Sequence, residues 1–274
     1  MIADCHMHML FDGVDWKASI FRGVDEGFIR KTLQTYKDLG YCYLRDGGDR
    51  FGVGKCARSF APEYGIAYRT PLAPLCKEGH YGSFIGLPWE DLSHYAQLVC
   101  RQKAEGADFI KIMISGLMDF SRFGVLTEPG LSPAEIRELV HIAQEEGMAV
   151  MAHCNGAETA IAAAEAGVDS IEHGAYLNKE ALCAMAEAHV IWVPTVSTVG
   201  NLIGKGRYPD TAVIPIFENF LENISAYGGL LAPGSDAGAW AVTHGCETEC
   251  PLLARAGITD GRLEEGIRAV MEKF

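Results

Sequence analysis

The chain has 274 residues, about half of them hydrophobic, and a formal net charge of −13 at pH 7. Its length and apolar content predict one domain over residues 1–274. The acidic balance argues against nucleic acid or an anionic membrane as a partner. No apolar run is long enough for a transmembrane helix, and the N-terminus lacks signal-peptide features. The nine cysteines form no Cys-x-x-Cys pair, so we expect reduced thiols and a cytoplasmic protein.

Short apolar runs alternate with amphipathic stretches along the chain. The predicted strands are MIADCH (1–6), YCYLR (41–45), IAYRTPL (66–72), DFIKIMI (108–114), MAVMAH (148–153), DSIEH (169–173), VIWVPT (190–195) and LLAPGSD (230–236). Helical patterns cover residues 89–106, 132–147 and 156–167, and the second begins with a capping box of Ser132 and Glu135. Longer irregular regions lie near 46–65, 73–88, 115–131 and 196–209.

Alternation of strands with helices predicts an α/β fold with parallel strands. Eight such units fit a (β/α)8 TIM barrel, whose C-terminal face the irregular regions would cap. An open, doubly wound sheet is the alternative, but it usually needs fewer strands.

Histidines and an aspartate stand at the ends of several predicted strands. His6 and His8 share one face of the first strand, because side chains alternate along a strand. His153, His173 and Asp236 end later strands. In a closed barrel these ends converge on one mouth, and imidazole and carboxylate groups are ligands for zinc. A His-x-His motif alone is weak, so the prediction rests on the whole set.

Lys111 lies within the apolar run FIKIMIS, where a buried ammonium group without a partner is costly. A salt bridge or a side chain that reaches the mouth would each solve this problem. Carboxylation by CO2 is a third solution, because the anionic carbamate can bridge two metal ions.

These residues resemble the amidohydrolase superfamily, in particular its imidazolonepropionase-like and metal-dependent prolidase branch. The matching segments are DCHMHM, YCYLRDGGD, KEGHYG, DFIKIMISG, MAHCNG, VDSIEHG, WVPT, LLAPGSDAG and HGCETECPLLARAGIT. The resemblance implies that His6, His8 and Asp236 bind one metal ion, that His153 and His173 bind a second, and that carboxylated Lys111 bridges them. Asn155 stands where the branch often has another histidine. The family's small accessory β-sandwich has no counterpart in this sequence, so we expect a bare barrel that self-associates as a homo-oligomer.

The predicted activity is metal-dependent hydrolysis of an amide, dipeptide-like or cyclic amide bond in a small molecule. Two zinc ions are expected, with manganese, iron or cobalt as alternatives. Asp236 would move the proton between the attacking water and the leaving group. The alternatives are a lactonase or phosphotriesterase-like hydrolase, a one-metal deaminase and, more remotely, a metal-binding barrel without activity.

Weaker candidates lie on the loops. His80 and Tyr176 are the predicted substrate contacts. Arg45 is expected to pair with Asp46 beneath the site. Arg122 and Lys205 are the remaining candidates for binding a substrate carboxylate, although exposed cations on loops usually have no specific role.

Overall fold

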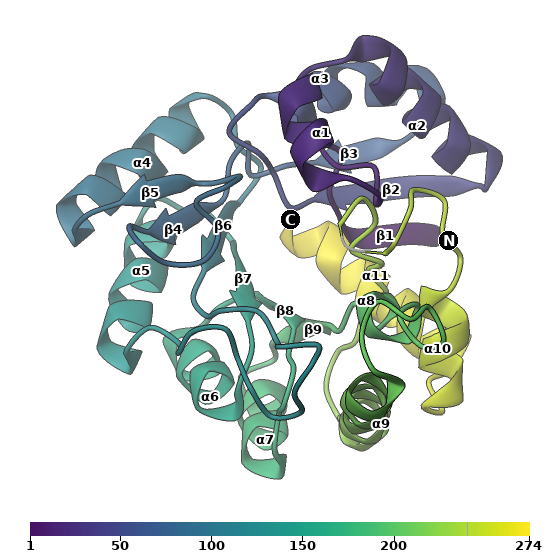
Figure 1. The fold of residues 1–274 in the computed structure, drawn as a ribbon. Helices are drawn as coiled ribbons and strands as arrows, with labels where there is room; N and C mark the ends of the chain where they lie inside the picture. The colour runs from purple at the N-terminus through teal and green to yellow at the C-terminus, as the bar shows by residue number, and fades with distance from the viewer. Residues whose placement is uncertain (240) are drawn as a thin grey trace.

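The computed structural model describes residues 1–239 and 241–274 (Figure 1). Its strands are β1 (Ile2–Met7), β2 (Tyr41–Asp46), β3 (Ala67–Arg69), β4 (Leu75–Lys77), β5 (Leu87–Trp89), β6 (Ile110–Met113), β7 (Val150–Cys154), β8 (Ser170–His173) and β9 (Ile191–Val193). Its helices are α1 (Trp16–Arg22), α2 (Glu26–Asp38), α3 (Val53–Phe60), the 3-10 turn η1 (Ala61–Tyr64), α4 (Leu92–Ala104), α5 (Pro133–Glu145), α6 (Ala157–Ala166), α7 (Lys179–Glu187), α8 (Ser197–Gly200), α9 (Asp210–Ala226), α10 (Glu249–Arg255) and α11 (Asp260–Lys273). Among these helices, none is both long and apolar enough to span a lipid bilayer.

The strands form a parallel ring with most of the helices packed around it (Figure 1). One sheet has the order β1-β2-β3, and the other has the order β5-β4-β6-β7-β8-β9. Between the two sheets, the amide of Asp108, just before β6, donates to the carbonyl oxygen of Thr70, just after β3, at 3.0 Å. The predicted (β/α)8 barrel is confirmed.

The eighth predicted strand, residues 230–236, is an extended segment rather than a regular strand. It nevertheless fills the last place in the ring, because Leu231 bridges to β9 and Ala237 bridges to β1. Pro233 has no N–H group and cannot extend a ladder of hydrogen bonds. The apolar pattern therefore located this part of the barrel correctly, but the proline prevents regular pairing.

Two regions predicted as irregular contain secondary structure. Residues 73–88 include β4 and part of β5, and residues 46–65 include α3 and η1. β4 and β5 are three residues each. Glycines and prolines surround these elements, and such residues are read as turn signals in a sequence.

β6 is an apolar strand that places one charged side chain, Lys111, inside the barrel. Its residues Ile110 and Ile112 face outward and join the core shared with the helices. Phe109, Lys111 and Met113 point the other way, into the barrel. Side chains alternate between the two faces of a strand, so every second residue here points inward. Phe109 therefore lies at the bottom of the barrel interior, Lys111 in the middle and Met113 at the mouth.

β1 is irregular at the point where its histidines begin. Asp4 pairs with Leu44 and Met7 with Asp46, so three steps along β1 match two along β2. Such an offset is a β-bulge, which places one extra residue in a strand and redirects the side chains beyond it. Cys5 consequently packs in the barrel interior rather than on the face of Met7, which a regular strand would require.

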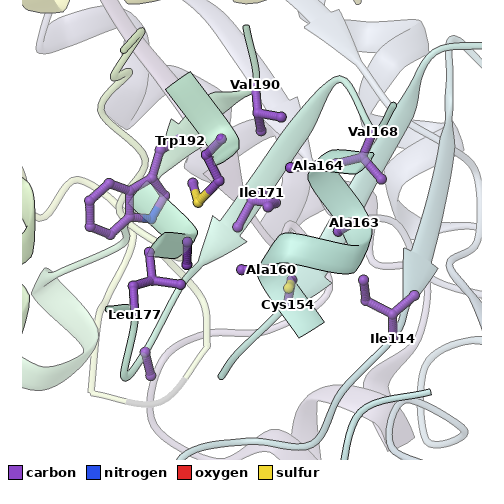
Figure 2. Close-up of a cluster of buried hydrophobic side chains, with 14 of the residues drawn as sticks. Ile114, Cys154, Ala160, Ala163, Ala164, Val168, Ile171, Leu177, Val190 and Trp192 are labelled. Atoms are coloured by element: carbon purple, nitrogen blue, oxygen red, sulfur yellow. The ribbon is translucent and has the colours of Figure 1, made fainter. Parts of the chain in front are cut away.

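The main core lies between β6–β9 and the helices that cover them, as Figure 2 shows for the part beside α6. Ala160, Ala163 and Ala164 of α6 face Ile171 and neighbouring strand residues. Alanine lets this short helix approach the sheet closely while losing little side-chain entropy.

The opposite end of the barrel is filled by the end of the chain. The ring of Phe274, which follows α11, lies 5.3 Å from that of Phe109. Its face also lies 4.4 Å from the guanidinium carbon of Arg45. These residues form an apolar floor beneath the charged middle of the barrel.

The predicted capping box at the start of α5 is present, and its contribution can be measured. The hydroxyl of Ser132 accepts from the amide of Glu135, and the Glu135 carboxylate accepts from the amide of Ser132. Ser132→Ala should lower the free energy of unfolding by about 1 kcal/mol. Ser132→Asp, which retains a capping oxygen, should keep nearly all of the stability in the same urea titration. Equal losses in both variants would contradict a capping role.

Candidate metal centre

The structure brings all six predicted metal-ligating residues together. His6, His8, Lys111, His153, His173 and Asp236 line one cavity of about 290 Å³ at the C-terminal ends of the barrel strands. The ring centres of His6 and His173 are 5.0 Å apart, and those of His153 and His173 are 4.6 Å apart. All six residues are at least nine-tenths buried.

Backbone geometry turns two of these residues into the cavity. His173 has a φ of 68° and Asp236 a φ of 56°, both in the left-handed region that residues other than glycine rarely adopt. Each such conformation costs on the order of 1–3 kcal/mol and tends to occur at functional sites. By strict alternation His173 would face outward, because its neighbour Glu172 faces the interior; its positive φ returns its ring to the mouth.

A fully buried charge cluster lies below His6. The Nδ1 atom of His6 donates to Oε2 of Glu172 at 2.6 Å. The other carboxylate oxygen accepts from Arg45 at 2.9 Å and from the Ser170 hydroxyl at 2.5 Å. Arg45 also donates to the carbonyl oxygen of Cys5 at 2.6 Å. This network fixes the orientation of the His6 ring and assigns its proton to Nδ1.

Comparable contacts orient two further histidines. Nδ1 of His173 lies 2.8 Å from the hydroxyl oxygen of Thr195, which can accept its proton. Nε2 of His153 lies 3.3 Å from the carbonyl oxygen of Gly116, which can only accept, and 3.4 Å from the side-chain nitrogen of Asn155, which can only donate. The Thr195 contact therefore leaves Nε2 of His173 with a free lone pair, whereas the contacts of His153 hold its ring without assigning its proton. Partners that fix the tautomer in this way are typical of metal-binding histidines.

Burial keeps the four histidines neutral. Burial, together with the smaller effect of the nearby Lys111 ammonium, lowers the pKa of His8 and of His153 to about 3. The pKa values of His6 and His173 are also far below the usual range, again mainly because of burial. A neutral imidazole has the lone pair that a metal ion requires.

Burial also disfavours charge on Lys111 and Asp236. It lowers the pKa of the Lys111 amine and raises that of the Asp236 carboxyl, and each group partly offsets the shift of the other. The cavity is therefore an unfavourable place for either charge by itself.

Three polar atoms in the centre lack hydrogen-bond partners among the described residues. They are Nε2 of His6, Nδ1 of His8 and Oδ1 of Asp236. The carboxylate oxygen lies 3.5 Å from Nε2 of His6 and 3.3 Å from Nε2 of His8. Ligand atoms of His6, His173 and Asp236 lie within 4.8 Å of one another. Buried polar groups are seldom left unsatisfied, so the donor set fits a divalent metal ion.

Glycines give the ligand side chains room. A Cβ at Gly47 would clash with the imidazole ring of His8, and one at Gly234 would lie 2.8 Å from Cβ of His6. Close packing against His8 and His6 therefore explains why glycine stands at positions 47 and 234.

Sequence reasoning missed several residues that support the centre. Glu172 was not predicted, although the alternation of DSIEH, with Ile171 outward, places a carboxylate inside the barrel. The prediction that Arg45 pairs with Asp46 is wrong, because the bulged β1 and the ring bring Arg45 to Glu172 instead. Asn155 donates to the Gly116 carbonyl oxygen at 3.0 Å and so supports the loop beside His153.

The two predicted substrate contacts lie away from the cavity lining. Nδ1 of His80 is 3.8 Å from a carboxylate oxygen of Glu128, and its neighbour Tyr81 lines the cavity instead. The Tyr81 ring lies 4.8 Å from that of His153. Tyr176 packs against Phe123, with ring centres 5.4 Å apart.

The family can now be assigned. Residues 54–214 match the model of the amidohydrolase family. This chain belongs to the amidohydrolase family. An ochratoxinase of Aspergillus niger is 34% identical over 229 residues, which cover 72% of this amidohydrolase and 47% of that protein. An uncharacterized protein of Mycobacterium tuberculosis is 27% identical over 237 residues, which cover 82% of this chain and 62% of that one. The chain thus spans about half to three fifths of these curated relatives.

Solved structures share the fold of this amidohydrolase. A Xaa-Pro dipeptidase with bound methionine has a TM-score of 0.77 at 20% identity, covering 99% of this chain and 75% of that one. The crystal structure of A. niger ochratoxinase has a TM-score of 0.74, also at 20% identity, covering 98% and 68%. At these identities the likeness supports the barrel architecture.

Loss of the buried carboxylate below His6 should destabilise the barrel strongly. Glu172→Gln removes the counter-charge of fully buried Arg45, so the free energy of unfolding should fall by about 3–5 kcal/mol in denaturant titrations of the metal-free protein. Glu63→Gln breaks the exposed pair with Arg30 and serves as the control, with an unchanged unfolding midpoint. Equal midpoints for both variants would show that the buried network contributes little.

Proposed function

We propose that this amidohydrolase uses divalent metal ions to hydrolyse an amide bond in a small molecule. The convergence of four neutral histidines and a buried aspartate on one cavity, where Nε2 of His6 and Oδ1 of Asp236 lack partners and lie 3.5 Å apart, is the observation that carries the proposal. The names of its relatives, ochratoxinase and Xaa-Pro dipeptidase, are consistent with this activity.

The residues divide into two sets of ligands. His6, His8 and Asp236 would hold one ion, and His153 and His173 would hold a second. Bound zinc, or manganese, iron or cobalt in its place, lowers the pKa of water and polarises a carbonyl group. The nearness of His173 to His6 and Asp236 also favours a second candidate, a single ion held across the two sets. That arrangement would suit a deaminase or a hydrolase of cyclic amides.

Lys111 would complete a two-metal centre as a carbamate. Its neutral amine attacks CO2, a carbon–nitrogen bond forms, and one proton leaves to solvent. The product is an anion where an ammonium would repel two dications. The side chain is 1% exposed and shares its cavity with all five other ligands. Carboxylation would thus turn a costly buried cation into a ligand.

Asp236 would act as the proton carrier. Its unpartnered Oδ1 faces His6 of β1 and His8 just after it, and can accept a proton from the attacking water. The same carboxylate can then pass this proton to the departing amine. Amide hydrolysis needs this transfer, because an unprotonated amine anion is a poor leaving group.

Metal content should follow the two ligand sets. After loading with zinc and bicarbonate, the protein should bind about two ions per chain, measured by plasma mass spectrometry. His8→Ala and His153→Ala should each lose about one ion, because each removes a ligand from a different set. His141→Ala, an exposed histidine of α5, is the control and should lose none. One ion in the parent protein would favour the single-ion candidate.

Lys111 should be essential for the two-metal reaction. Lys111→Ala should lower hydrolysis of an amide substrate by at least ~100-fold, the scale of losing one stabilising group from an active site. Acetate or propionate should restore part of the activity, because a free carboxylate can replace the carbamate. Full activity of Lys111→Ala, or the absence of a carbamate carbon signal in the 13C NMR spectrum of folded protein loaded with metal and 13C-bicarbonate, would refute the carbamate.

A further inference from the structure

The cavity above the histidines has apolar walls. Residues that line it outside the ligand set are Phe11, Trp16, Tyr81, Phe84, Ile85, Met113, Leu117, Met118, Phe120, Thr198 and Ala239. They come from separate parts of the chain: the loop after β1, α1, the segment between β4 and β5, β6 and the loop after it, α8, and the loop after the eighth segment. Several loops therefore cooperate to surround whatever lies over the metal centre.

Aromatic rings form a continuous arc from His8 to His153. Ring centres are 5.9 Å apart for His8 and Phe11, 6.3 Å for Phe11 and Phe84, 5.6 Å for Phe84 and Tyr81, and 4.8 Å for Tyr81 and His153. Trp16 joins the arc from α1, 5.9 Å from Phe84. The two ends of the arc, His8 and His153, are predicted metal ligands. A group that packs on the rings between them would therefore lie beside the metal centre.

Positive charge is scarce on these walls. Among the described lining residues, Lys111 is the one lysine or arginine, and it lies within the ligand set. Arg122 forms an ion pair with Asp119 at 2.8 Å and points into solvent, with a 70% exposed side chain. A substrate carboxylate remote from the scissile amide would therefore be desolvated without a counter-ion, which is costly. The net charge of −13 would further disfavour an anionic substrate.

We infer that this enzyme selects uncharged amides that carry an aromatic or large aliphatic group, and discriminates against dipeptides with free termini. This inference rests on the proposed amide hydrolysis and adds the substrate class. Phe84 and Trp16 are its specificity-determining residues, because they form the arc without being ligands. Burial of an apolar group against these rings supplies the binding energy.

A matched pair of chromogenic amides tests the inference. The 4-nitroanilide of 3-phenylpropanoic acid and the mono-4-nitroanilide of glutaric acid share a leaving group, but the acyl chain ends in a neutral phenyl ring in the first and in a carboxylate in the second. We expect kcat/KM of the metal-loaded enzyme to be at least ~100-fold higher for the phenylpropanoyl compound, because burying an unpaired carboxylate is costly. The dipeptide Leu-Pro should be hydrolysed at a similarly low efficiency. Equal or greater efficiency for either charged compound would overturn the inference.

Variants of the arc should act through binding. Phe84→Ala and Trp16→Ala should each raise KM for the phenylpropanoyl anilide by about tenfold, the size expected for losing part of an aromatic contact. Phe21→Ala removes a 95% exposed aromatic side chain from the same helix as Trp16 and should leave KM unchanged. An unchanged KM in both arc variants would count against the aromatic subsite.

Calorimetric binding to the metal-free protein separates this inference from the proposed reaction. 3-Phenylpropananilide should bind at least ~10-fold more tightly than glutaranilic acid, because no ion is then present to attract the acid. Phe84→Ala should reduce the difference, because the neutral anilide loses part of its aromatic contact, and Phe21→Ala should preserve it. If this preference appears while no amide is hydrolysed, the proposed reaction fails but the subsite stands. If hydrolysis occurs and the acid binds as tightly as the neutral anilide, the inferred substrate class is refuted while the proposed reaction stands.

Discussion

The hydrogen bond between Nδ1 of His6 and the carboxylate of Glu172 is the contact on which the metal centre depends. Both partners are fully buried, so the bond acts in a low-dielectric interior where its geometry is strongly enforced. Arg45 neutralises the same carboxylate and ties it to the backbone of β1. One network thus fixes the tautomer of His6, a proposed metal ligand, spans the barrel from β1 and β2 to β8, and leaves Nε2 of His6 facing Asp236.

Much of this arrangement could be predicted from the order of residues along the chain. Strand ends of a parallel barrel meet at one face, so His153, His173 and Asp236 could be placed beside His6 without a structure. Lys111 could be placed inside the barrel because its neighbours are apolar. These predictions depend on the order of the strands and on the alternation of side chains along a strand, and both can be read directly from a sequence.

The remaining features depend on contacts between distant residues or on single backbone angles. Arg45 and Glu172 are 127 positions apart, and no local pattern pairs them. The bulge in β1 and the left-handed φ of His173 redirect side chains that regular strands would point elsewhere. His80 and Tyr81 show the same limit, since a turn decides which of two adjacent rings enters the cavity. β4 and β5 were not predicted because the prolines and glycines around them are typical of turns.

The floor made by Phe109 and Phe274 bears on how protons travel. Below the charged middle of the barrel the described interior is apolar, with Tyr43, Met151 and Ile191 in the same cluster. If Asp236 carries the proton as proposed, proton exchange with bulk water would pass through the mouth, which a bound amide would block. A proton taken from water would then stay beside Asp236 until the departing amine takes it up. Phe274, which follows α11, would thereby help return the proton to the product, although it lies on the far side of the barrel from the reaction.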